Sequence, residues 1–155
     1  MKKLVLFVCL SVSLLILASC SSSIVSVAPQ ATPKSIDGYM DVQADTIDWV
    51  KLIVASGGSV SGQWIADTGQ KGAGTQTIYP MTGIFEEGNN AISLTLQGSQ
   101  GATISVSGTF ENSVLSVDMQ QGSTVKHLVL TGAAESDYAA ALATFEKKYP
   151  IAPGA

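Results

Sequence analysis

Hydrophobic and polar residues alternate through the middle of the chain. Ile92, Leu94 and Leu96 alternate with serine, threonine and glutamine, and the same two-residue period recurs over 103–110 and 115–119. Such alternation places one face of a strand on a core and the other in water, as antiparallel sheets do. Gly-, Asn- and Ser-rich turns separate the runs. The pattern predicts eight strands, near residues 39–43, 47–55, 59–66, 76–86, 90–97, 102–110, 113–120 and 124–131.

Eight sequential strands with short links predict a mainly β fold. We expect an antiparallel up-and-down β-barrel or a strongly curled sheet, lipocalin-like in outline, because closure limits exposed edges. A two-sheet β-sandwich is the alternative. The longest predicted loop is the glycine-rich segment 67–74.

The period changes near the C-terminal end. Tyr138, Leu142, Phe145 and Tyr149 fall on one stripe of a helix, so a helix is predicted over 136–149 with Ser136 as its N-cap. We expect this helix to pack on the barrel through its aromatic stripe. The predicted domain therefore covers 37–150, and 151–155 form a tail.

A hydroxyl-Gly-x-aromatic pattern occurs at 61–64, 82–85 and 107–110. Glycine lets a strand bend, or lets a large ring lie over its backbone, so the pattern indicates a curling sheet with a packed aromatic core. The alternative is that aromatic rings line a ligand cavity. The candidates for such a lining are Trp49, Trp64, Tyr79, Phe85 and Phe110.

The first residues have the features of a secretory signal. Met1, Lys2 and Lys3 give a positive start, and the apolar run 4–17 ends in the small residues Ala18 and Ser19. The run is shorter than the roughly 20 residues that a membrane-spanning helix needs. We therefore predict a signal peptide over 1–19.

Leu17-Ala18-Ser19-Cys20 resembles the lipobox of bacterial lipoprotein precursors. That resemblance implies cleavage before Cys20, a lipid such as palmitate carried on this residue, and a domain held outside the cytoplasm on the cell membrane or the outer membrane. Residues 20–36 are rich in serine and contain two prolines, which is typical of a flexible tether.

Charge and composition exclude several functions. Two of the eight basic residues, Lys2 and Lys3, lie in the predicted signal peptide, which leaves six lysines against twelve acidic residues. Nucleic-acid binding depends on basic residues, so we expect none. Cys9 and Cys20 are the two cysteines and His127 is the single histidine, which argues against a thiolate or multi-histidine metal site and predicts no metal or cofactor.

The remaining motifs give little support for catalysis. Ser123 and Lys126 fit Ser-x-x-Lys, but the pair falls at a predicted turn and lacks the companion motifs of penicillin-recognising enzymes. His127 has no acidic neighbour in sequence. The acidic residues between 37 and 48 do not fit a calcium loop and are interpreted as a solvated segment. We predict that the chain is not an enzyme.

Two further resemblances concern the whole domain. The pattern of 82–85, the segment 90–94 and the segment 135–142 resemble small lipoproteins of monoderm bacteria, which implies a hairpin domain with a terminal helix but transfers no activity. Gly62-Gln63-Trp64 is similar to a motif of lipocalin-like barrels and of small bacterial β-barrel protease inhibitors. We expect a non-catalytic envelope lipoprotein with a structural or protein-interaction role. The alternatives are a binding module for a small apolar ligand and, more remotely, a protease inhibitor.

Overall fold

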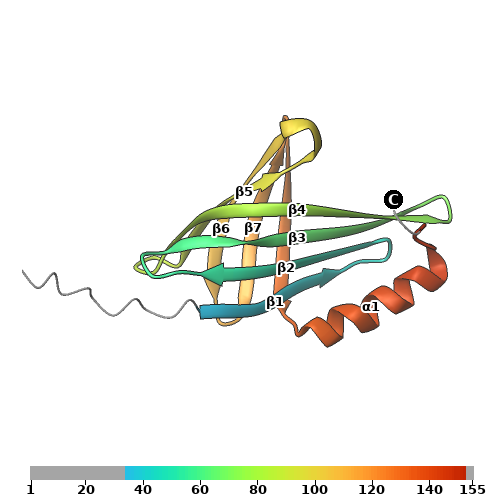
Figure 1. Ribbon diagram of the computed structural model, residues 1–155, viewed down its shortest axis with the longest axis horizontal. Helices are drawn as coiled ribbons and strands as arrows, with labels where there is room; N and C mark the ends of the chain where they lie inside the picture. The colour runs from blue at the N-terminus through green and yellow to red at the C-terminus, as the bar shows by residue number, and fades with distance from the viewer. Residues whose placement is uncertain (1–33, 153–155) are drawn as a thin grey trace, which may run out of the picture.

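A computed structural model describes residues 34–152, with side chains from Gly38 onward (Figure 1). The predicted signal peptide, Cys20, most of the predicted tether and the end of the tail lie outside the described residues. The eight strands are joined in sequence order as a closed antiparallel barrel. This confirms the predicted barrel with one C-terminal helix, and the sandwich alternative is not what the chain forms.

Five of the eight strands and the helix lie within one residue of their predicted bounds. The short 3-10 turn η1 (Ser99–Gly101) connects two of the strands, and α1 (Glu135–Lys148) follows the last one. The strands are β1 (Lys34–Val42), β2 (Thr46–Val54), β3 (Ser59–Gln70), β4 (Ala73–Glu86), β5 (Ala91–Gln97), β6 (Thr103–Glu111), β7 (Val114–Gln121) and β8 (Thr124–Gly132).

The barrel consists of two groups of strands, β1 to β4 and β5 to β8, and the two junctions between these groups are short. Residues 81–86 of β4 pair with 91–96 of β5. At the other junction only Tyr39 and Met40 of β1 pair with Gly132 and Thr131 of β8, and we call this junction the seam. In Figure 1, β1 to β4 run along the molecule while β5 to β7 rise steeply across them. Because these two groups of strands diverge in direction, the two ends of the barrel differ in shape.

Inward-facing side chains fill much of the barrel. They are mostly aliphatic and include the fully buried Leu52, Leu96, Leu115 and Leu130. A second cluster lies outside the barrel, where Ile47, Trp49 and Ile65 meet α1. Apolar residues therefore occupy both faces of β2, which explains why the alternation is weak there.

The helix α1 packs on the outer face of β1 to β3 through its aromatic stripe, as predicted. Trp49 of β2 stacks on Tyr138 with ring centroids 4.8 Å apart and planes 16° apart. The Trp49 ring also lies directly over Gly38, where a β-carbon would meet the indole. Glycine in β1 thus gives the indole room to lie flat beneath the helix.

The glycines of the repeated pattern act through backbone contact. A β-carbon on Gly62 would meet the carbonyl oxygen of Lys51, and one on Gly108 would meet that of Ser116. Gly83 is placed in the same way against the carbonyl oxygen of Ser93. Neighbouring strands therefore approach each other most closely at these points, and glycine permits the coiling that closes the barrel.

The predicted loop over 67–74 is wrong. β3 and β4 continue through it, and only Lys71 and Gly72, with φ of 51° and 81°, form the turn. Positive φ at both central residues is the geometry of a tight hairpin turn. Gly69 and Gly74 are needed because Tyr149 lies against both of them, not because the segment is a loop.

Two boundaries also differ from the prediction. β1 begins at Lys34, so the last residues of the predicted tether belong to the barrel. The N-cap of α1 is Ala134 rather than Ser136, and the Asp137 carboxylate accepts a hydrogen bond from the Ala134 N–H at 2.9 Å. The acidic side chain at the third helical position thus supplies the half of a capping box that satisfies the N-cap N–H, and no N-cap side chain supplies the other half.

Candidate functional site: the barrel mouth

One end of the barrel contains a cavity of about 280 Å³. The turns at 43–45, 71–72, 98–102 and 122–123 surround this end, which we call the mouth. The opposite end, which we call the base, holds the turns at 55–58, 87–90 and 112–113 and the beginning of β1. The cavity is partly enclosed, so a small molecule could enter from the mouth.

One wall of the cavity is mainly apolar. Trp64 of β3 and Tyr79 of β4 are direct cross-strand partners. Trp64 is fully buried, whereas Tyr79 is half-buried. The apolar lining residues are Trp64, Ala66, Tyr79, Leu96, Ile104 and Met119.

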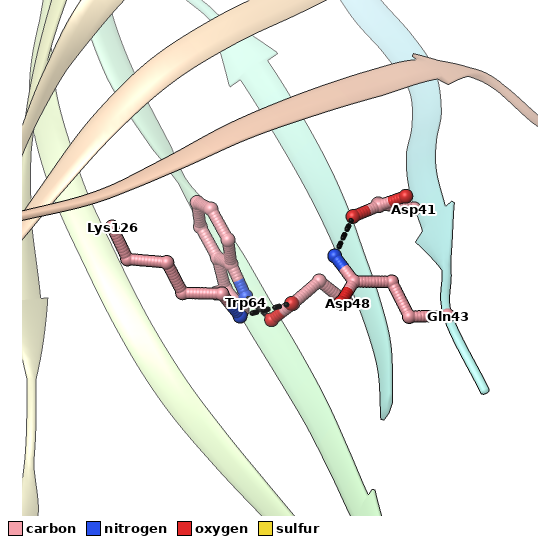
Figure 2. Close-up of polar contacts among 5 residues, drawn as sticks. All are labelled: Asp41, Gln43, Asp48, Trp64 and Lys126. Atoms are coloured by element: carbon pink, nitrogen blue, oxygen red, sulfur yellow. Dashed lines mark hydrogen bonds and ion pairs between the residues drawn. The ribbon is translucent and has the colours of Figure 1, made fainter. Parts of the chain in front are cut away.

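The other wall is polar and centres on Asp48. Its Oδ1 accepts a hydrogen bond from Trp64 Nε1 at 2.8 Å, and its Oδ2 lies 3.2 Å from Lys126 Nζ (Figure 2). The Asp48 side chain is 7% exposed and that of Lys126 is 43% exposed. The polar lining residues are Thr46, Asp48, Asp67, Thr68, Gln121 and Lys126.

Strand geometry explains how Lys126 reaches Asp48. Asp48 shares the inward face of β2 with Val50 and Leu52, and Lys126 shares that of β8 with Leu128 and Leu130. β8 and β1 do not pair at this level, so the lysine side chain crosses the seam to β2. Figure 2 shows the side chains of Lys126 and Asp48 extending toward each other from opposite sides.

A second carboxylate adds negative charge beside this pair. Asp41 of β1 is the cross-strand partner of Asp48, so both side chains lie on the same face of the sheet. Asp41 Oδ2 accepts a hydrogen bond from Gln43 Nε2 at 2.8 Å. Like charges on opposed positions repel each other, and Lys126 offsets part of that repulsion.

Asp67 forms a separate network between β3 and α1. Its carboxylate accepts hydrogen bonds from Tyr138 Oη and Gln76 Nε2, each at 3.0 Å, and is fully buried. Burial raises the pKa of the Asp67 carboxyl group, although the hydrogen bonds from Gln76 and Tyr138 act in the opposite direction. Burial, and then the charge of Asp67, raise the pKa of the Tyr138 hydroxyl group. This network attaches the helix to the barrel, so the Asp67 carboxylate has partners in Gln76 and Tyr138 although the residue also borders the mouth cavity.

The structure distributes the five predicted ligand-lining aromatics over three places. Trp64 and Tyr79 line the mouth cavity. Phe85 and Phe110 lie near the base, where Phe110 packs edge-on against Tyr39 at 5.3 Å between ring centroids, and they border an open hollow there. Trp49 lies outside the barrel under α1 and lines no part of the mouth cavity.

Sequence reasoning missed the two charged residues of the site. The prediction of a solvated acidic segment is wrong for Asp48, because its side chain is buried. The signal was present, since Asp48 interrupts the otherwise apolar run 47–50. Lys126 fits the Ser-x-x-Lys pattern with Ser123, yet its partner among the described residues is Asp48.

His127 lies on the outer surface, away from the cavity lining. Its Nδ1 lies 2.8 Å from Asp118 Oδ1 on the neighbouring strand, and both side chains are exposed. Asp118 on β7 is therefore the acidic partner of His127, although no acidic residue is adjacent to His127 in the sequence. Within residues 34–152, no group of three or more histidine, cysteine or carboxylate side chains is arranged to hold a metal ion.

No protein family, curated protein or solved structure matches the chain. Its own residues therefore carry the functional argument. In the part of the chain that the structure describes, no helix has the length and apolar character needed to cross a membrane.

Proposed function

We propose that the chain is a lipoprotein anchored through Cys20 whose barrel binds a small molecule in its mouth. The observation that carries this proposal is the partly enclosed cavity of about 280 Å³ at the mouth of the barrel, next to a packed aliphatic core. Binding sites are typically concave and mostly apolar, with a few convergent polar groups, and lie in the mouths of β-barrels. The volume lies near the lower limit of about 300 Å³ for such sites, which favours a small ligand.

The asymmetry of the interior supports a binding role. Toward the base, aliphatic side chains pack together inside the barrel, as a purely structural domain would require. At the mouth, the interior instead contains the charged residues Asp48 and Lys126. Burying charged groups is costly, and apolar residues of similar volume often stabilise a fold equally well. A polar wall in this position is better explained by recognition than by stability.

The direction of the chain is consistent with an anchored binding protein. β1 begins at the base, where Lys34 pairs with Val54, and the mouth lies at the other end. A lipid on Cys20 would therefore hold the base toward the membrane and leave the mouth open to the surroundings. This proposal includes removal of the signal peptide, lipidation of Cys20 and a location in the cell envelope.

A fragment screen tests the binding role. Saturation-transfer NMR on the full chain in lipid nanodiscs should detect small amphipathic fragments that bind the wild type. These signals should disappear in Ile104→Trp, which places a large ring in the cavity. They should persist in Ile78→Trp, whose site on the outer face of β4 is 51% exposed. Fragments that bind equally well to Ile104→Trp would contradict the proposed site.

The anchor has its own test. Palmitate labelling and intact-mass analysis of the wild type should show a lipid adduct that is absent from Cys20→Ala, and only the wild type should partition with membranes. Unchanged mass and partitioning in Cys20→Ala would contradict the anchor without affecting the proposed cavity.

A protein-interaction role is the second candidate, and a different surface favours it. An apolar groove of about 270 Å³ lies between the β1–β2 turn and the end of α1, bordered by Val42, Ile47 and Phe145. Val42 is 53% exposed beside it. A photo-crosslinking residue at Val42 should give a defined adduct in cells, whereas one at Val125, on the outer face of β8, should not. Equal labelling at both positions would argue against this role.

A further inference from the structure

The polar wall of the mouth presents hydrogen-bond donors that a ligand can reach. The Asp48 carboxylate is 7% exposed and each of its oxygens already has a partner, so it is poorly accessible. Lys126 is 43% exposed, and among the described residues its ammonium group has Asp48 as its one hydrogen-bond partner. An ammonium group carries three N–H donors, so two remain for a ligand. The atom that meets this wall should therefore be an acceptor.

The charges around Lys126 disfavour a charged ligand of either sign. A ligand carboxylate would approach an ammonium that is already neutralised by Asp48 at 3.2 Å. A ligand ammonium would meet the exposed Lys126, whereas the Asp48 carboxylate is 7% exposed and Asp41 is not among the residues that line the cavity. Moving a charge from water into a partly enclosed site is costly unless an opposite charge is free to pair with it. An uncharged acceptor avoids this cost.

The facing wall defines the rest of the ligand. Its apolar lining includes Tyr79, Leu96, Ile104 and Met119, of which Leu96 is fully buried. Apolar surface removed from water stabilises a complex by roughly 25 cal/mol per Å². A ligand that spans both walls therefore needs an apolar body and a polar end.

We propose that the mouth cavity binds a small uncharged amphipath. Its carbonyl or hydroxyl oxygen accepts a hydrogen bond from Lys126 Nζ, and its apolar body lies on Tyr79, Ile104 and Met119. This inference rests on the proposed binding function and specifies the class of ligand.

A matched series of compounds tests the class. Hexanamide and hexanoate share a pentyl chain, hexylamine carries a chain one methylene longer, and the three compounds differ in charge at neutral pH. Each is titrated into the full chain, with ¹⁵N-labelled tryptophan, in lipid nanodiscs, and its free concentration is corrected with empty nanodiscs. The two indole N–H resonances give an internal control, because Trp64 Nε1 bonds to Asp48 in the site and Trp49 lies outside the barrel.

Hexanamide should shift the Trp64 indole resonance, leave that of Trp49 unchanged, and bind at least about tenfold more tightly than either charged analogue. The double variant Asp48→Asn with Lys126→Met removes both charges and the donor, and keeps an acceptor for Trp64. It should lose about tenfold in affinity for hexanamide. Lys51→Met removes a lysine on the outer surface and should leave the affinity unchanged.

The possible failures are distinguishable. If hexanoate or hexylamine binds as tightly as hexanamide, and Ile104→Trp abolishes that binding, the uncharged class is wrong while the binding function stands. If hexanamide binds equally well to the double variant, the role of Lys126 is wrong. If none of the three compounds moves the Trp64 resonance and the fragment screen is also negative, the proposed function itself is wrong.

Discussion

Lys126 Nζ lies 3.2 Å from Asp48 Oδ2 across a part of the seam where β8 and β1 do not pair. The two residues are separated by 78 positions in the chain. The contact joins the last strand to the second inside the barrel and completes the polar wall of the mouth. It therefore connects barrel stability with the candidate site.

Lys126→Met should destabilise the barrel. The substitution keeps the apolar stem of the side chain but leaves the buried Asp48 carboxylate with Trp64 as its remaining donor. We expect the free energy of unfolding to fall by roughly 1–3 kcal/mol, measured by urea denaturation. Adding Asp48→Asn should recover most of that loss. Lys51→Met is the matched control, because Lys51 and Glu135 are 45% and 75% exposed and should contribute less than about 1 kcal/mol. A loss as large in the control would contradict the role of the buried pair.

Asp67 should make the fold less stable as the pH rises. Its pKa is raised in the folded chain, so the folded state holds the proton more tightly than the unfolded state does. The contribution of the protonated carboxyl group is complete below its unfolded pKa of about 4 and is lost as the pH passes through the folded pKa.

Asp67→Asn tests this pH dependence. Its amide can accept from Gln76 and donate to the Tyr138 hydroxyl oxygen, so the network is retained without the charge. Relative to the wild type, the variant should gain free energy of unfolding as the pH rises from about 4 toward 7. Asp118→Asn, at an exposed site, is the control. A constant difference between Asp67→Asn and the wild type across this range would disprove the assignment.

Gly108→Ala should damage the barrel severely. The new β-carbon would overlap the Ser116 carbonyl oxygen on β7, and the backbone of a central strand cannot move away without breaking its pairing. We expect a loss of at least about 3 kcal/mol or failure to fold, followed by circular dichroism and thermal unfolding. Gly88→Ala lies in open space and should change stability by about 0.5 kcal/mol or less. Equal stability of the two variants would contradict the close strand approach at Gly108.

Phe145→Ala should weaken the attachment of α1. Phe145 is 7% exposed within the outer cluster, and removing a buried aromatic ring typically costs about 3–5 kcal/mol. Thermal unfolding should show the loss, and hydrogen exchange should place it in α1 before the barrel. Ala143→Ser changes the exposed side of the same helix and should have an effect of about 0.5 kcal/mol. Uniformly faster exchange throughout the barrel would mean that the helix is not a separable layer.

Local sequence signals predict most of the fold. The two-residue period places the strands of the second half of the barrel closely, and the stripe Tyr138, Leu142, Phe145 predicts the helix and its aromatic contact face. These features depend on neighbouring residues, so a single sequence contains them. The prediction of a loop over 67–74 is wrong because Gly69 and Gly74 accommodate Tyr149, which is distant in the chain. The sequence alone does not distinguish glycines needed for such a contact from glycines of a loop.

The candidate site was only partly predictable. Trp64 and Tyr79 followed from their aromatic character and their strand positions, but Trp49 has the same character and faces the opposite side of the sheet. β2 is apolar on both faces, so its alternation does not reveal which face lies inside. Asp48 and Lys126 meet only through the closure of the barrel, which is a long-range outcome that no local pattern specifies.

The short seam has a consequence for how the chain acquires its structure. Tyr39 and Met40 of β1 pair with Gly132 and Thr131 of β8. β1 can therefore form this pairing only after nearly the whole domain has been synthesised. Local hairpins form first, and a contact between the ends of a chain carries the largest loop-closure cost. Closure at the seam is therefore a late step in folding. Until then, β1 and β8 expose unpaired edges, and the growing domain is most open to strand exchange with another chain.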